Sequence, residues 1–444
     1  MASTVSPPGG FSAPPTRARS IALSFAVILA VVTYIDRVAI SQAAPFITED
    51  LGLTRVQMGW ALAIFGYAYA IFEIPGGWLA DRVGPRRVLM RIVLWWSFFT
   101  AATGWVWSAT SLIAVRGMFG AGEAGAFPGM TRMLTTWLPK NERERAQSLI
   151  WLATRMAGAF TPLIVVWLIS HLTWPRMFEL FGIIGVVWAF FFFRWFRDDP
   201  ATHPSVNKAE LALLPPASEV AVAHGGVPWK LIFTNRSVWL LSIQYMCLAY
   251  GWWFYINWLP TYLREQQGGV QFGGLQLGPF VTAMLAGLPL LLGGFGCLVS
   301  AAVLPRVAKA VGSVRLARRI VALCGFVGAS ACIFIFTGIQ HPIYAMFVLG
   351  MAGFFNDVIM PAAWAGTMDI GGRYAGTVSG AMNMMGSIAG AFSVTVVAYI
   401  LTWTNDNWTL TFMISSAIYM VGAVCWLFLD SHTPVEASAP SAQA

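Results

Sequence analysis

Long apolar runs dominate this chain, and short polar stretches separate them. A helix needs about 20 apolar residues to cross ~30 Å of hydrocarbon. Twelve runs reach that length, at 20–44, 56–80, 88–107, 110–137, 147–171, 175–196, 237–263, 279–304, 318–338, 341–368, 375–402 and 408–429. The pattern therefore predicts an all-α integral membrane protein with twelve transmembrane helices.

Composition and charge support this class and suggest an orientation. The 444 residues are 57% hydrophobic and only 10% charged, whereas roughly a quarter of a soluble chain is charged. If the N-terminus is inside, twenty Lys and Arg fall in inside segments and three in outside segments. We therefore expect a multi-pass protein of the cell (inner) membrane with both termini cytoplasmic. The same asymmetry explains the net charge of +8 without a nucleic-acid partner.

A polar stretch at 197–236 divides the chain, with six apolar runs before it and six after it. The halves echo each other, because "MAGAFTP" at 156–162 resembles "IAGAFSV" at 388–394. Paired six-helix repeats with a site between them are a known transporter architecture. The expected parts are a disordered cytoplasmic tail at 1–19, a six-helix bundle at 20–196, a cytoplasmic linker at 197–236 with a short helix at 208–214, a second bundle at 237–430 and a cytoplasmic tail at 431–444.

Four charged residues lie in the first and fourth runs, away from the ends of each run: Asp36, Arg37, Arg116 and Glu123. Arg116 and Glu123 are seven residues apart and share one helical face, at depths that overlap that of Asp36. Charges within a span usually face a cavity and pair there. One pair can be a structural clamp, but two facing pairs indicate a site. Guanidinium groups match a carboxylate, and carboxylates can exchange protons, so the set predicts co-transport of an anion and H⁺.

The stretch "GGWLADRVGPRR" at 76–87 predicts a cytoplasmic gate. Its acid can accept backbone N–H groups at a neighbouring helix N-terminus, and its arginines can pair across the half and hold one gate shut. The gate residues are Gly77, Asp81, Arg82, Gly84, Arg86 and Arg87.

The same stretch resembles the G-x-L-A-D-R-x-G loop of the major facilitator superfamily, and the resemblance covers residues 20–430. In the corresponding second-half loop, Pro305 stands where an acid would be expected, so that loop is expected to lack the gate acid.

Further motifs resemble the anion:cation symporter branch of that superfamily, which includes bacterial sugar-acid permeases and animal vesicular glutamate and sialic-acid carriers. These motifs are "YIDR" (34–37), "RGMFGAGEA" (116–124), "NWLPTYL" (257–263) and "RYAGTVSGAMN" (373–383). The resemblance implies that Asp36 and Glu123 are proton-linked acids and that Arg37 and Arg116 face the substrate. It also implies that Tyr34 and Asn383 are polar positions near the substrate.

Several other residues have two interpretations. Arg155 is either a third substrate arginine, suited to a more highly charged anion, or an ion-pair partner of Asp357 or Glu73. Asp357 is either a second acid that exchanges protons or a structural residue. Asn257 is a candidate ligand for substrate hydroxyls, and Tyr67 is a candidate to line the cavity.

The expected function is a proton-coupled symporter that imports an organic anion, a sugar-acid carboxylate first, by alternating access. The alternatives are an exchanger of phosphate esters or dicarboxylates, and a sensor or scaffold with a transporter fold. The sequence has no nucleophile–base pair, metal-ligand cluster or phosphate-cradling motif, so no enzyme activity, catalytic residue, metal or cofactor is expected. A monomer that binds its anion, protons and the lipid bilayer is the expected form.

Overall fold

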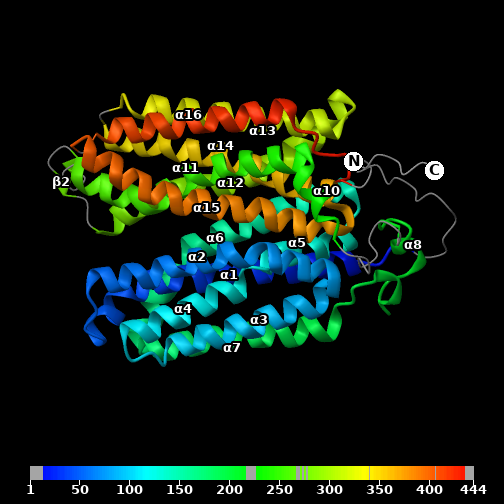
Figure 1. Cartoon of the computed structure of the whole chain (residues 1–444), viewed down its shortest axis with the longest axis horizontal. Helices are drawn as coiled ribbons and strands as arrows, with labels where there is room; N and C mark the ends of the chain where they lie inside the picture. Colours follow the sequence, from blue (N-terminus) through cyan, green and yellow to red (C-terminus); the bar gives the residue numbers. More distant parts are fainter. Residues whose placement is uncertain are drawn as a thin grey trace.

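A computed structural model describes residues 14–216, 227–266, 271–272, 275–276, 279–339, 341–405 and 407–435. Within them the long helices run side by side along the longest axis of the molecule (Figure 1). The first group of helices comprises α1 (Ala18–Asp50), α2 (Arg55–Val83), α3 (Pro85–Thr103), α4 (Ala109–Glu123), α5 (Ala126–Trp137), α6 (Arg143–His171) and α7 (Trp174–Trp195).

The second group of helices comprises α11 (Arg236–Gln266), α12 (Pro279–Val311), α13 (Val314–Phe336), α14 (Pro342–Gly371), α15 (Ala375–Trp403) and α16 (Trp408–Phe428). Counting α4 and α5 as one, the described residues make the twelve helical crossings that the apolar runs predict. Short elements connect them: η1 (Lys140–Glu142), η2 (Pro200–Thr202), α8 (Lys208–Leu211), α10 (Trp229–Thr234) and η3 (Gly372–Tyr374). The described part also contains one small antiparallel pair of strands, β1 (Gln271–Phe272) and β2 (Leu275–Gln276).

Local sequence fixes where several helices begin. Thr54 starts α2 with a capping box, in which its side chain accepts from the Gln57 amide and Gln57 accepts from the Thr54 amide. Ser108 and Ser111 form the same arrangement at the start of α4.

Seven stretches of the described chain are long and apolar enough to cross a membrane on length and composition alone.

The fourth apolar run is not one helix, which corrects the expected continuous span at 110–137. It divides at Ala124 and Gly125 into α4 and α5. Pro128 has no N–H to donate to the Ala124 carbonyl, so the hydrogen-bond ladder is interrupted at this point. Glu123 is the last residue of α4 and therefore lies at the break.

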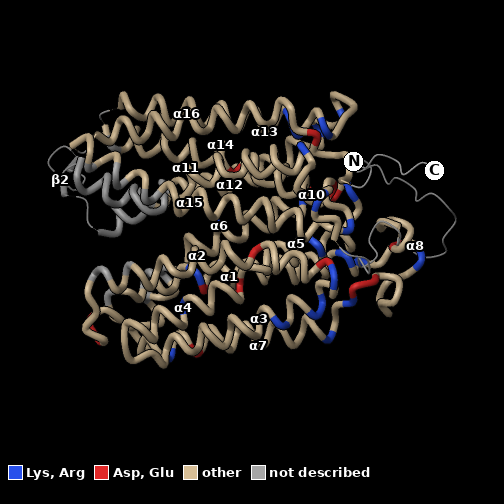
Figure 2. Tube along the Cα trace, viewed as in Figure 1, with Lys and Arg blue, Asp and Glu red and all other residues tan. Residues whose placement is uncertain are grey.

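The two groups occupy opposite sides of the molecule, with α1–α7 below and α11–α16 above in Figure 1. Across the boundary between them, α2 packs on α15, and α6 packs on α12 and α14. Lys and Arg gather at the end of the bundle that carries α8 and α10 (Figure 2). We call this the charged end.

The first part of the expected linker is folded against the first group of helices. Glu210 of α8 accepts hydrogen bonds from the backbone amides of Ala18 and Arg19, and so caps the N-terminus of α1. Thr16 Oγ1 also donates to Glu210. The short helix ends at Leu211, earlier than the expected 214. Residues 1–13 and 436–444 of the expected tails lie outside the described residues, whereas Ser431 and Val435 are buried.

Candidate functional site: a central charge cluster

The four predicted charges of α1 and α4 lie in one region, which we call the central charge cluster: Asp36, Arg37, Arg116 and Glu123. Its tightest contact is the ion pair between Arg37 Nε and Glu123 Oε1, at 2.5 Å. The Glu123 side chain is fully buried, whereas that of Arg37 is 21% exposed. Arg37 is therefore the member of this pair that a solute can reach.

Aromatic rings surround the Arg37 guanidinium. Its Cζ lies 4.5 Å from the ring centre of Tyr69 and 5.7 Å from that of Tyr34. Phe65 and Phe127 add rings at 5.4 and 5.5 Å. Ring faces attract a cation, and apolar walls strengthen any charge–charge contact made between them.

Asp36 points to a different side of α1 from Arg37, because successive residues of a helix are about 100° apart. Asp36 is buried beside Trp96 and Thr100 of α3, and Arg116 and Glu123 of α4 are its charged neighbours. The Arg116 guanidinium lies 4.6 Å from the ring centre of Phe119. The cluster thus contains an outer pair, Arg37 and Glu123, and an inner acid and base, Asp36 and Arg116.

Several polar atoms of the central charge cluster are buried without a hydrogen-bond partner among the described residues. They are both carboxylate oxygens of Asp36, Arg37 Nη2, Arg116 Nε and Glu123 Oε2. Buried polar groups are normally hydrogen-bonded, so each exception requires an explanation. Unused donors on two arginines beside unused acceptors on two acids suit a site that exchanges an anion and protons.

Arg155 makes a bidentate ion pair across the boundary between the two groups of helices. Its Nε donates to Asp357 Oδ2 at 2.6 Å and its Nη2 to Asp357 Oδ1 at 2.8 Å. Its Nη1 donates to Tyr34 Oη at 3.3 Å, and its guanidinium lies 3.7 Å from the ring centre of Trp252. The structure therefore shows the second of the two interpretations of Arg155, an ion pair with Asp357.

Asn383 of α15 also makes a contact that the sequence does not predict. Its amide Nδ2 donates to Glu73 of α2, and Ser387 Oγ donates to the other oxygen of Glu73 at 3.3 Å. The Asn257 side chain lies outside the part of the chain that the structure describes.

Tyr69, rather than Tyr67, is the tyrosine of α2 that lies over Arg37. The two residues are about 200° apart around the helix, and Tyr67 is 47% exposed. Tyr69 is close to Arg37 in space although it lies 32 positions later in the chain. The contact therefore depends on how α1 packs on α2 and cannot be found from the sequence alone.

At the charged end, Asp81 holds the N-terminus of α15. Its carboxylate accepts from the backbone amides of Gly376 and Thr377 at 3.0 and 2.6 Å, and from Thr377 Oγ1 at 2.6 Å. Gly77 lies one turn earlier, and a Cβ there would lie 2.1 Å from the Gly376 carbonyl oxygen. The predicted gate acid therefore joins the two halves, and glycine allows the backbones to meet.

Two of the gate arginines make their contacts within the first half. Arg86 donates through its side chain to the Phe193 carbonyl at 2.7 Å, and Arg82 lies over the Trp78 ring, so both contacts stay within the first group. Arg87 is exposed at the surface. Arg132 lies 3.6 Å from Asp81 and also donates to the Gly372 carbonyl. It is therefore an arginine of the first half that contacts the second half.

Gly84 has a positive φ of 94°, and a Cβ there would lie 2.6 Å from Asp198 Oδ2. Asp198 accepts from the backbone amide of Arg86 at 2.8 Å. Burial raises the pKa of the Asp198 carboxyl, although this hydrogen bond and the nearby arginines act in the opposite direction. This glycine therefore lets the chain turn closely around the start of the linker.

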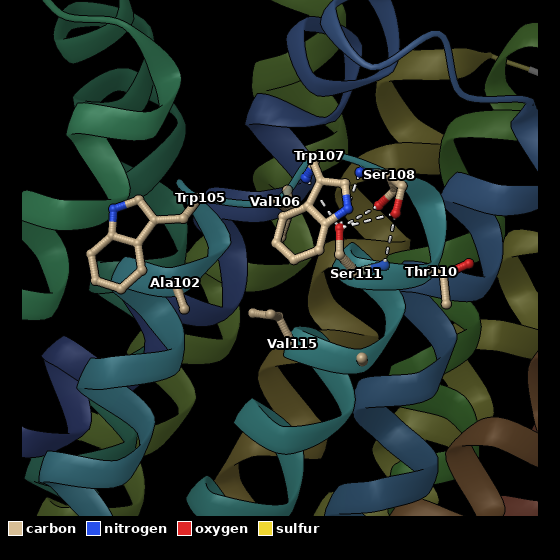
Figure 3. A pocket seen from close by; sticks show the side chains of 9 residues that line it. Ala102, Trp105, Val106, Trp107, Ser108, Thr110, Ser111 and Val115 are labelled. Atoms are coloured by element: carbon tan, nitrogen blue, oxygen red, sulfur yellow. Dashed lines mark hydrogen bonds between the residues drawn. The ribbon is translucent and has the colours of Figure 1, made fainter.

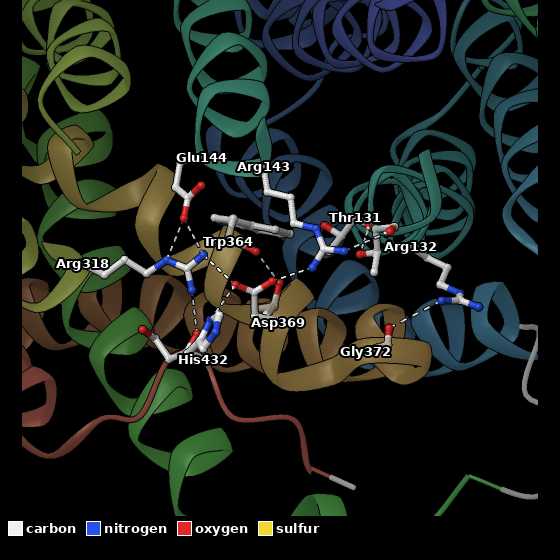
Figure 4. A network of polar contacts seen from close by, with 12 residues as sticks. Thr131, Arg132, Arg143, Glu144, Arg318, Trp364, Asp369, Gly372 and His432 are labelled. Atoms are coloured by element: carbon white, nitrogen blue, oxygen red, sulfur yellow. Dashed lines mark hydrogen bonds and ion pairs between the residues drawn. The ribbon is translucent and has the colours of Figure 1, made fainter. Parts of the chain in front are cut away.

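A second polar network joins the halves at the charged end, and the sequence analysis does not identify it (Figure 4). Asp369 of α14 accepts from Arg143 at 2.5 Å and from Arg318 at 2.8 Å. Arg318 also donates to Glu144 at 2.9 Å and to the Ser431 carbonyl at 2.7 Å. Asp369 thus supplies an acid on the second half, at the end where the loop around Pro305 lacks one.

A cavity of about 530 Å³ lies at the other end of the bundle, between the ends of α3 and α4 (Figure 3). Its lining is mainly apolar, and its side-chain hydroxyl groups are those of Ser108, Thr110 and Ser111. It has no charged side chain, so it does not match an anion site. No group of residues able to hold a metal ion occurs in the described ranges.

Comparison with known proteins identifies the family. The sequence model of the Major Facilitator Superfamily matches residues 26–394. This chain belongs to the Major Facilitator Superfamily. The human organic anion transporter MFSD10 (TETRAN) has the same fold, with a TM-score of 0.67 at 15% identity over 92% of this chain and 99% of that one.

Two bacterial relatives align along almost the whole chain. The probable sulfoacetate transporter of Cupriavidus necator is 34% identical over 95% of this chain and 96% of its own length. The D-galactonate transporter of Escherichia coli is 28% identical over 94% and 97%. These relatives match the anion:cation symporter branch, as the motifs in the sequence indicate, and the chain is a membrane transporter rather than a soluble protein.

Proposed function

We propose that this transporter is a proton-coupled symporter that imports a small organic anion across the inner membrane by alternating access. The observation that carries the proposal is the pair of Arg37 and Glu123, 2.5 Å apart, in which only the arginine is partly exposed. A solute anion that enters this region meets a guanidinium whose present partner is a titratable acid.

The coupling follows from competition for Arg37. A carboxylate or sulfonate that binds the guanidinium displaces Glu123. Glu123 is then a buried acid without its cation, and such a group takes up a proton. Anion and proton binding therefore favour each other, and Asp36 beside Arg116 extends the same exchange to a second acid and base.

Two substrate classes fit this proposal. The first is a sugar-acid carboxylate, because Tyr34 supplies a hydroxyl group beside Arg37 and a relative is named as a D-galactonate transporter. The second is a short sulfonated carboxylate, because the relative with 34% identity is named as a probable sulfoacetate transporter. Arg155 is paired with Asp357, so it supports neither class as a third free cation.

We propose that the charged end faces the cytoplasm, since positive residues concentrate on the cytoplasmic side of membrane proteins. Asp81 and Asp369 then join the halves on the cytoplasmic side, and this arrangement corresponds to a closed inner gate. Opening that gate requires breaking both sets of contacts.

Uptake into liposomes tests the proposal. Purified protein is reconstituted and supplied with D-galactonate or sulfoacetate, with a pH gradient, acidic outside, and no substrate within. Accumulation that collapses when a protonophore removes the gradient supports symport. Uptake that occurs only when the vesicles are preloaded with anion contradicts symport and favours an exchanger.

A further inference from the structure

Glu73 is a buried acid that the proposed mechanism does not use. It lies in α2, with no exposed surface, at the contact with α15. We call the line of contacts from Glu73 to Asp81 on α2, and from Thr377 to Ser387 on α15, the α2–α15 seam. In the described part of the chain, no Lys, Arg or His forms an ion pair with Glu73.

Both oxygens of Glu73 are used across the seam. Asn383 donates to Oε1 and Ser387 donates to Oε2, and both donors belong to the opposite half of the molecule. The α15 backbone is also close, since a Cβ on Gly380 would lie 2.6 Å from the Glu73 carbonyl oxygen. The carboxylate therefore keeps these partners only while α2 and α15 stay together.

The charged and titratable groups that face Glu73 come from three other helices and from its own. They are Arg37 of α1, Glu123 of α4, Tyr245 of α11 and Tyr69 of α2. Arg37 is the one cation in this set, and its ion-pair partner is Glu123. An anion bound to Arg37 would neutralise the positive charge that favours an ionised Glu73.

We propose that Glu73 is a third proton-carrying acid, which exchanges its proton as the α2–α15 seam opens and closes. The inference rests on the proposed proton coupling and extends it from the central charge cluster to the gate. Anion binding at Arg37 favours protonation of Glu73, and opening of the seam removes Asn383 and Ser387 and exposes the acid to cytoplasmic water. Glu73 thus links the occupancy of the site to the closure of the charged end.

Paired proton and substrate fluxes test the inference in proteoliposomes with D-galactonate or sulfoacetate as probe. Glu73→Gln keeps the size of the side chain and removes its proton exchange. We expect fewer protons per anion and an uptake–pH curve that loses part of its alkaline limb. Glu49→Gln, at an exposed acid near the end of α1, is the matched control and should behave as the wild type.

The outcomes separate the two proposals. Wild-type protein without proton-driven uptake contradicts the proposed function itself. Proton-driven uptake with the same stoichiometry and pH profile in the wild type and in Glu73→Gln overturns the inference alone. If Glu73→Gln does not fold, Ser387→Ala decides: the loss of one donor to the carboxylate should move the alkaline limb to higher pH, and an unchanged curve overturns the inference.

Discussion

Arg37 and its neighbour Asp36 explain why the first helix keeps an acid and a base in an apolar run. The two side chains leave α1 in different directions, so they do not neutralise each other. Arg37 faces Glu123 and the rings of Tyr34 and Tyr69, whereas Asp36 faces α3 and Arg116. One residue can then meet the solute while the other stays buried.

Replacing Arg37 by Lys should reduce substrate affinity at least about tenfold, a change of about 1.4 kcal/mol. An ammonium group keeps the charge but cannot present the guanidinium fork to a carboxylate or sulfonate. Thermal-shift titration of the purified protein measures the change in affinity. Arg87→Lys, at an exposed position, is the control, and equal affinity in both variants would contradict a substrate-facing role for Arg37.

Arg155 and Asp357 should behave as a pair. Arg155→Gln leaves Asp357 buried without its cation, and the loss of one partner of a buried pair typically costs about 3–5 kcal/mol. The double variant Arg155→Gln/Asp357→Asn removes both charges and should regain most of the lost thermal stability. If the double variant is as unstable as the sum of the two single variants, Arg155 and Asp357 are not coupled.

Residue types and spacing predict part of the candidate site. The charges of α1 and α4 lie close together, as their spacing suggests, because charged side chains within a span usually face the interior of the bundle and pair there. Spacing cannot assign partners, since a helix reaches several neighbours at once. Hence the contacts of Asn383 with Glu73 and of Tyr69 with Arg37 required the structure, as did the choice of Asp357 over Glu73 as the partner of Arg155.

At the scale of elements, α2 and α15 form a contact that depends on glycine. Gly77 lies against the carbonyl of Gly376, and Asp81 caps the N-terminus of α15, which begins at Ala375. A helix N-terminus carries free N–H groups and a partial positive charge, so a carboxylate can hold it without an arginine partner. The glycine, aspartate and spacing of the loop motif follow from this one contact.

Gly77→Val should prevent the charged end from closing, because even a Cβ would overlap the Gly376 carbonyl. We expect loss of uptake and greater labelling of cysteines placed along the cytoplasmic half of the seam. Gly66→Ala is the matched control on the same helix, where the nearest heavy atom to a new Cβ is the Trp253 ring at 3.9 Å. Labelling of Gly77→Val that equals that of the wild type would contradict this description of the gate.

Helix positions could be predicted well from the apolar runs, and breaks within them could not. The run at 110–137 is mainly apolar on both sides of the break, and the division at Gly125 follows from Pro128 and from backbone geometry. The contact partners of the gate-loop arginines could not be predicted from the sequence, for a related reason. Arg86 is closer to Phe193 of α7 than to the other half, and that proximity depends on how α3 packs on α7.

At the scale of the molecule, the charged end joins the halves through ionic contacts on two sides. Asp81 and Arg132 act at α15 and η3, and Asp369, Arg143 and Arg318 act between α6, α13 and α14. The sequence indicated an inner gate from its first half alone. The role of Asp369 could not be predicted from the sequence, because it lies at the end of a span rather than in a recognisable loop motif.

Arg318→Gln should destabilise the closed charged end, since Arg318 is fully buried and its loss leaves Glu144 and Asp369 with less positive charge. We expect a lower Tm and greater cysteine labelling from the cytoplasmic side, with substrate affinity changed much less. Arg176 forms an ion pair with Glu179, and its side chain is 72% exposed. Arg176→Gln is therefore the control and should leave Tm nearly unchanged. An equal Tm in the two variants would show that the network does not hold the halves together.

The central claim is that one buried acid, Glu123, exchanges its bond to Arg37 for a proton when an anion binds. The most direct measurement is proton uptake from weakly buffered solution as sulfoacetate or D-galactonate is added to purified protein, followed with a pH-sensitive dye. The wild type should take up protons in proportion to bound anion, and Glu123→Gln should bind the anion with a clearly smaller proton uptake. Anion binding with identical proton uptake in both proteins would contradict the account.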